Sequence, residues 1–144
     1  GSIFHGFLYE KALKAGIQNQ SNVTLASIHF LAPAITVERA SQAFTAGGTG
    51  AVPANRFFVH MLASQAEDSD SITIYPSSLL TYVADHLESA SGRIPVLGIR
   101  KDFLAAPVTF ATGVPATQSR RHGEFDDRGH EIDGVLEAIG KATY

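Results

Sequence analysis

Short runs of apolar and β-branched residues recur along the chain, separated by stretches with helical periodicity. Three runs, Val23–Leu31, Arg56–Leu62 and Ile94–Ile99, are dense in apolar side chains and only weakly alternating. This pattern is typical of strands that are covered on both faces, as in parallel sheets. Val108–Thr112 is a further short extended candidate. We therefore expect at least three strands.

Helical spacing fills the intervals between these runs. The clearest helix is predicted over 79–87, where apolar residues follow a 3.6-residue period after Pro76. Further helices are predicted over 4–15, 35–44 and 131–141. Strands that alternate with helices imply parallel pairing, because parallel neighbours need a crossover connection. We expect a single α/β domain with a mostly parallel sheet of at least three strands and helical crossovers, in a three-layer, sandwich-like arrangement.

The opening helix has no predicted strand before it, and the predicted sheet has unprotected edges. Unpaired strand edges are usually covered by another segment or by another chain. We therefore expect one of two situations. Either an upstream strand is missing and the chain is a fragment without its N-terminal half, or the chain forms a homo-oligomer and is not a stable monomer.

Composition narrows the classes of function. The chain has 144 residues, a net charge of −3 and no cysteine, with 44% hydrophobic and 17% charged residues. Such values indicate a folded chain without a broad basic face, which argues against nucleic-acid binding. The lack of cysteine excludes disulfides, thiolate metal sites and a cysteine nucleophile, and it leaves the compartment open, with the cytoplasm favoured. No apolar run reaches the roughly 18 residues that a membrane span needs, and no motif indicates a cofactor.

Two polar stretches follow predicted strands, where catalytic groups gather in open parallel sheets. An acidic loop after the second strand holds Glu67, Asp68 and Asp70, and a long loop near the end of the chain holds His122. A carboxylate beside a histidine orients the imidazole and stabilises its charged form. Because both loops leave the same edge of the sheet, we expect His122 within about 4 Å of Asp70 or Glu67, or one water away. The alternative is that both loops are simply solvated.

Other candidate sites have weaker signals. The stretch 46–50 is glycine-rich but lacks the lysine of a P-loop. His29 and His60 lie inside apolar strands and are expected to be hydrogen-bonded core or interface residues. Nitrogen and oxygen ligands also gather near the end of the chain without the spacing of a known metal motif, so no metal is assigned to them. They are His122, Glu124, Asp126, Asp127 and His130.

The order of five segments resembles a known family. They read NVTLASIHFLAPAITVERA, RFFVHMLASQAEDSD, YPSSLLTYVADHLE, IPVLGIRKDF and RRHGEFDD, and the resemblance covers most of the chain. This succession is similar to the C-terminal half of α/β-hydrolase-fold proteins of the serine esterase or lipase type. In that family the catalytic triad runs Ser, then Asp or Glu, then His along the chain. The resemblance implies Glu67 or Asp70 as the acid and His122 as the histidine.

The nucleophile is where the chain departs from the family. The G-x-S-x-G elbow is absent, and Ser2 lies at a suitable distance before the first helix. The resemblance therefore implies a serine ester hydrolase, acting on a small-molecule ester, whose nucleophile lies upstream or has been lost, with Ser2 as a further candidate. A non-catalytic α/β assembly or interaction module is the alternative. A G-x-S-x-G sequence directly upstream in the gene would favour the hydrolase.

Overall fold

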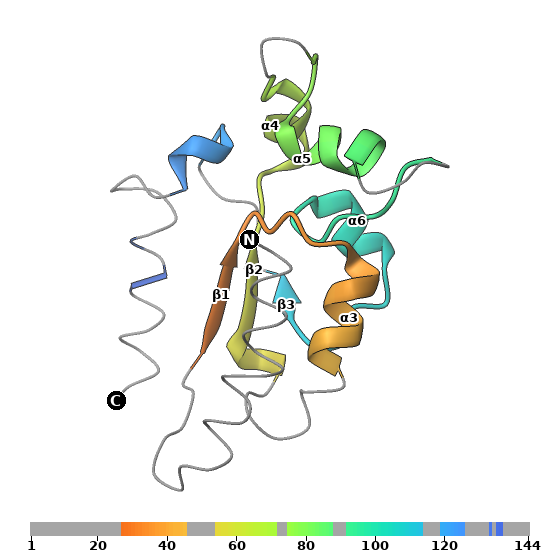
Figure 1. Cartoon of the computed structure of the whole chain (residues 1–144). Coiled ribbons are helices and arrows are strands. Elements are labelled where there is room, and N and C mark those ends of the chain that lie inside the picture. The colour runs from red at the N-terminus through yellow and green to blue at the C-terminus, as the bar shows by residue number, and fades with distance from the viewer. Residues whose placement is uncertain are drawn as a thin grey trace, which may run out of the picture.

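The computed structural model describes residues 27–45, 54–71, 75–87, 92–113, 119–125, 133 and 135–136. Within these ranges, strands alternate with short helices (Figure 1). The strands are β1 (Ile28–Leu31), β2 (Phe57–His60) and β3 (Thr112–Gly113). The helices, which include the 3-10 segments η2 and η4 and the π segment η3, are α3 (Val37–Thr45), η2 (Ala54–Arg56), α4 (Ser64–Ser69), α5 (Leu79–Tyr82), η3 (Val83–Leu87), α6 (Arg100–Ala105) and η4 (His122–Glu124).

Strands β1 and β2 form the parallel pair that the sequence predicts. Their register runs from Ile28 opposite Phe57 to Leu31 opposite His60, and α3 is the crossover between them. The two-residue strand β3 pairs in parallel with the other side of β2, in the order β1-β2-β3. The described part of the chain is therefore an α/β fold with a parallel sheet. The carboxyl ends of its strands share one edge.

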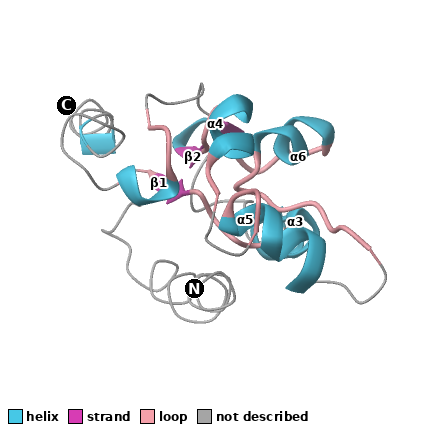
Figure 2. Cartoon of the chain, turned by 90° about the horizontal axis from the view of Figure 1, so that it is seen from above, coloured by secondary structure: helices cyan, strands magenta, loops and turns pink. Residues whose placement is uncertain are grey.

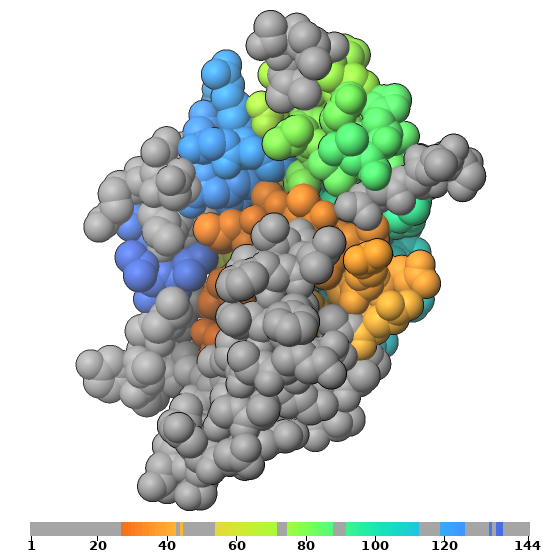
Figure 3. Space-filling view, in the orientation of Figure 1, coloured from red at the N-terminus to blue at the C-terminus, as the bar shows by residue number. Residues whose placement is uncertain are grey.

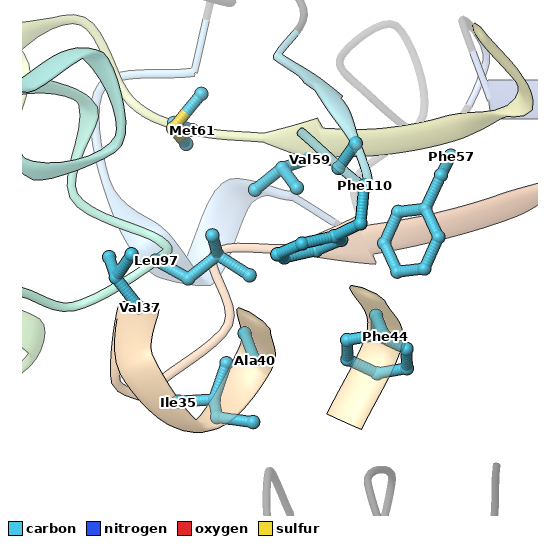
Figure 4. Packing of buried hydrophobic residues seen from close by; sticks show 10 residues of the cluster. Ile35, Val37, Ala40, Phe44, Phe57, Val59, Met61, Leu97 and Phe110 are labelled. Atoms are coloured by element: carbon cyan, nitrogen blue, oxygen red, sulfur yellow. The ribbon is translucent and has the colours of Figure 1, made fainter. Parts of the chain in front are cut away.

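One face of the sheet carries the larger hydrophobic core. Phe57 and Val59 of β2 pack against Ala40 and Phe44 of α3, and Phe110 closes the cluster from the segment before β3 (Figure 4). The ring centroids of Phe44 and Phe57 lie 5.0 Å apart, and those of Phe57 and Phe110 lie 5.3 Å apart, both in edge-to-face geometry. Aromatic pairs at this separation contribute beyond the area that they bury. This core fixes the orientation of β2, whose end leads into the polar segment.

The prediction of a third strand over 94–99 is wrong. Val96 makes only an isolated antiparallel bridge with Thr36, and the chain turns at Gly98 before α6. The backbone N–H of Val96 bonds to the Asp102 carboxylate at 2.9 Å instead of to a strand. Val96 is nonetheless fully buried. The apolar run therefore predicted burial correctly here. It did not distinguish a strand from a loop, because a buried loop and a buried strand can have the same amino-acid composition.

The segments after β2 are more helical than the sequence suggested. The predicted acidic loop is helix α4, which contains Glu67 and Asp68 and ends at Asp70. The predicted helix over 79–87 is confirmed as α5 followed by η3. Helices α3, α5 and α6 lie on the same side of β1 and β2 in both orientations (Figure 2). The predicted helix over 35–44 is confirmed as α3.

Several predictions fall outside the described residues. These include the opening helix over 4–15, the start of the first strand and the glycine-rich stretch 46–50. Of the predicted closing helix over 131–141, only Asp133, Val135 and Leu136 are described, and all three are helical. None of the helices in the described ranges is long and apolar enough to cross a membrane.

Candidate functional site

Helix α4 brings two carboxylates to the carboxyl end of the sheet. It begins four residues after the end of β2, and its pitch separates inward from outward positions. Glu67 faces inward and is only 3% exposed, whereas the neighbouring Asp68 is exposed. Asp70 terminates the helix, and its backbone N–H donates to the carbonyl of Ala66 at 2.9 Å. The helix therefore presents one buried and one half-buried carboxylate to the same region.

The short helix η4 delivers His122 to these carboxylates. The backbone N–H of Arg120 donates to Glu124 Oε2 at 2.7 Å, which closes the η4 turn on itself. The N–H of His122 then donates to Asp70 Oδ2 at 3.0 Å, and its Nδ1 lies 2.7 Å from the same oxygen. The η4 segment lies beside α4 and α5 at one end of the molecule (Figure 3). The predicted proximity of His122 to Asp70 is confirmed.

Glu67 approaches the opposite side of the same imidazole ring. Its Oε2 lies 3.3 Å from His122 Nε2. Within the described chain, both of these buried atoms lack an aligned hydrogen bond, so the contact is one of charge and not of hydrogen-bond geometry. The other oxygen, Oε1, accepts a hydrogen bond from Ser78 Oγ. Glu67 is thus held by Ser78 and rests against His122.

Ser78 connects this cluster to helix α5. Its side chain is fully buried and caps α5, accepting the N–H of Thr81 at 3.1 Å while its own hydroxyl donates to Glu67. A serine before an apolar helical run is a known N-cap signal. That signal would have marked Ser78 as a cap. No local pattern marks its bond to Glu67, which lies 11 residues earlier.

The environment of His122 changes its acid–base properties. Burial alone lowers the pKa of His122, because a low-dielectric site disfavours the charged ring. The two carboxylates, Glu67 first and then Asp70, outweigh burial and raise the pKa of His122 above its ordinary 6.5. The imidazolium form can donate from both ring nitrogens toward the two carboxylates. The site therefore favours the protonated form of His122 more than solvent does.

The structure brings together three of the four candidate catalytic residues. Asp70, Glu67 and His122 converge, and Ser2 lies outside the described residues. In chemical terms, an imidazole held at Nδ1 by a carboxylate is a general base that acts through Nε2.

No group of three or more metal-binding side chains forms within the described ranges, and Asp126, Asp127 and His130 of the candidate ligands lie outside them. No family model, no curated protein and no solved structure matches the chain. The interpretation of the site consequently depends on its own geometry.

Proposed function

We propose that the chain carries the acid and the general base of a serine ester hydrolase that acts on a small-molecule ester. His122 is the base, Asp70 is the acid that orients it, and the nucleophilic hydroxyl comes from Ser2 or from upstream of this sequence. The proposal includes further strands and the three-layer arrangement of that fold. The observation that carries it is the 2.7 Å contact between Asp70 Oδ2 and His122 Nδ1.

Asp70 suits the acid role better than Glu67. Asp70 contacts Nδ1 and also accepts the backbone N–H of His122, so one oxygen fixes both the ring and its attachment. With Nδ1–H directed to this carboxylate, Nε2 is the nitrogen that would take a proton from a hydroxyl, in place of its contact with Glu67 Oε2. Chain order agrees as well, since the acid follows β2 and the histidine follows β3.

The proposed reaction uses His122 in both of its steps. Nε2 accepts the hydroxyl proton as the serine oxygen attacks the ester carbonyl, and the resulting imidazolium is stabilised by Asp70. That proton then passes to the departing alcohol, which leaves an acyl-enzyme. In the second step Nε2 takes a proton from water, the hydroxide attacks the acyl carbonyl, and the proton returns to the serine as the acid departs. The raised pKa of His122 favours the imidazolium that forms in each step.

A fluorophosphonate probe tests the proposal directly, because it labels only an activated serine. We expect labelling of this chain, or of the chain extended by its upstream sequence. His122→Ala should abolish the labelling. Asp68→Asn is the matched control, because Asp68 is an exposed carboxylate on the same helix as Glu67. If neither form of the wild-type protein is labelled, the catalytic proposal is overturned.

One observation favours the alternative of a non-catalytic assembly or interaction module. The 3.3 Å contact of Glu67 Oε2 places a carboxylate on the nitrogen that a nucleophile would need. In a non-catalytic module, Asp70, His122, Glu67 and Ser78 would serve to join α4, α5 and η4. Substitution of His122 would then lower the free energy of unfolding. Neither the wild type nor the variant would hydrolyse an ester.

A further inference from the structure

A second pair of ionisable residues lies on the strands themselves. His29 of β1 and His60 of β2 both point to the sheet face opposite the aromatic core, because side chains alternate along a strand and Phe57 and Val59 occupy the core face. The parallel register sets His29 opposite Phe58, two positions before His60. Neither histidine takes part in the proposed ester hydrolysis.

The two rings are held at a short distance from each other. His29 Nδ1 lies 3.0 Å from His60 Nε2. On its other side, His29 Nε2 lies 3.2 Å from Ser27 Oγ, and the ring stacks on Phe58 with centroids 4.8 Å apart. The backbone carbonyl of His60 also accepts the N–H of Ala32 at 2.9 Å. Two paired strands, a hydroxyl and an aromatic ring therefore fix which nitrogens face each other.

Imidazole nitrogen is a common protein ligand of Zn²⁺, Ni²⁺ and Cu²⁺. A ring nitrogen binds such an ion through its lone pair, so a two-histidine site needs one unprotonated nitrogen from each ring close together. The 3.0 Å contact between His29 Nδ1 and His60 Nε2 provides that pair of nitrogens.

We propose that His29 Nδ1 and His60 Nε2 form a two-imidazole site for a divalent cation of the Zn²⁺, Ni²⁺ and Cu²⁺ group. Metal–imidazole bonds of about 2.0–2.1 Å place two nitrogens on one ion about 2.9–3.4 Å apart, depending on the angle at the metal. The observed separation of 3.0 Å falls within that range. Among the described residues these two imidazoles are the only protein ligands of the site.

Ser27 supplies the outer support that such a site requires. Metal-bound histidines usually direct their other ring nitrogen to an oxygen, which fixes the tautomer. When His29 donates from Nε2 to Ser27 Oγ, its Nδ1 carries the free lone pair. His60 Nε2–H donates to that lone pair in the metal-free protein. On binding, the His60 proton moves from Nε2 to Nδ1 through solvent, and the two freed lone pairs bind the ion to one side of the line between the nitrogens.

Calorimetric titration of the whole chain with CuCl₂, NiCl₂ and ZnCl₂ tests the proposal. We expect one equivalent to bind, with Cu²⁺ tighter than Ni²⁺ or Zn²⁺. Affinity should fall at least tenfold in both His29→Ala and His60→Gln. His86→Ala is the matched control, because His86 is an exposed histidine on η3, and it should bind as wild type. MgCl₂ should give no binding, since a hard cation prefers oxygen ligands.

Electron paramagnetic resonance of the Cu²⁺ form separates loss of a ligand from loss of folding. The wild-type spectrum should carry the hyperfine pattern of two imidazole nitrogens, and the folded His29→Ala protein should show one at most. Wild-type affinity in His29→Ala would overturn the proposal. Binding that disappears only in His122→Ala would overturn it as well, because the ion would then sit at the carboxylate cluster.

Discussion

Two histidines of this protein, His60 on strand β2 and His122 on η4, have opposite acid–base properties. His60 is 7% exposed and faces another imidazole, and its pKa is lowered to about 4. His122 is also largely buried but faces Asp70 and Glu67, and its pKa is raised. Burial lowers the pKa of both rings, so the charge of the neighbours decides the outcome. Burial alone therefore does not identify a proton-accepting histidine.

The difference follows from where each histidine lies in the sequence. His60 is the last residue of a strand whose other members are apolar, and the parallel neighbour β1 sets a second imidazole, that of His29, beside it. His122 lies in a polar loop that η4 folds back onto the end of α4. The strand context places His60 beside a second imidazole, whereas the loop context places His122 beside two carboxylates.

The largest expected effect comes from removing the charge beside His122. In Asp70→Asn the shape is kept, but the imidazole loses the carboxylate at Nδ1 and can adopt the wrong tautomer. If the hydrolase proposal holds, the rate of fluorophosphonate labelling should fall by about 10⁴-fold. The pKa of His122, followed by NMR, should also fall because one opposing charge is gone.

Asp68→Asn separates a local effect from a general loss of acidic charge on α4. It should leave both the labelling rate and the pKa of His122 as in wild type. Equal labelling of Asp70→Asn and Asp68→Asn would show that Asp70 is not the orienting acid. If Asp70→Asn lowers the pKa of His122 but the wild-type protein is not labelled, the contact between Asp70 and His122 stands and the hydrolase proposal is overturned.

The next largest effect is a difference in the free energy of unfolding between substitutions of His122 and of His60. His122→Leu leaves the buried Glu67 carboxylate without its partner, and we expect a loss of about 3 kcal/mol in the free energy of unfolding. His60→Leu removes one hydrogen bond between neutral groups, which costs about 1 kcal/mol. Urea unfolding of the metal-free proteins near pH 6 measures both. Equal losses would contradict the contrast between a charged and a neutral cluster.

The pH dependence of the two rings should have opposite signs. As pH falls, NMR of the imidazole protons should show His122 charging above pH 6.5, whereas His60 stays neutral down to about pH 4. The raised pKa of His122 means that its stabilising contribution is complete below pH 6.5 and is lost as pH rises through the folded value. The lowered pKa of His60 means that stability falls as pH drops from 6.5 toward 4. In Glu67→Gln the His122 transition should move to lower pH, and an unmoved transition would remove Glu67 from the cluster.

The sequence predicted the parallel pair and the meeting of the two polar segments for the same reason. Alternating strands and helices restrict the topology, and parallel topology places the ends of successive strands at one edge. The proximity of Asp70 and His122 therefore required no side-chain information. The choice between Asp70 and Glu67 did require it, because that choice depends on which face of α4 points inward and on how η4 turns.

Long-range hydrogen bonds account for what the sequence left undetermined. The segment 94–99 has a strand-like composition, but the Asp102 carboxylate takes the N–H of Val96 and holds it in a loop. Ser78 reads as a helix cap, while its bond to Glu67 appears only in three dimensions. In both places a side chain binds a group that local periodicity does not reveal.

The smallest expected effect lies at the turn that follows β1. Ala32 has φ of 41°, in the left-handed region, where a Cβ is strained by roughly 1–2 kcal/mol. The backbone N–H of Ala32 nevertheless donates to the carbonyl of His60, so the strained turn is tied to the end of β2. In Ala32→Gly the strain is relieved, and the greater entropy of glycine in the unfolded chain offsets part of the gain. We expect a net increase of about 0.5 kcal/mol in the free energy of unfolding, with the pKa of His122 unchanged.

Ala34→Gly is the control, because Ala34 has no positive φ and its replacement by glycine should lower the free energy of unfolding instead. A loss of stability in Ala32→Gly as large as that in Ala34→Gly would show that the turn is not strained.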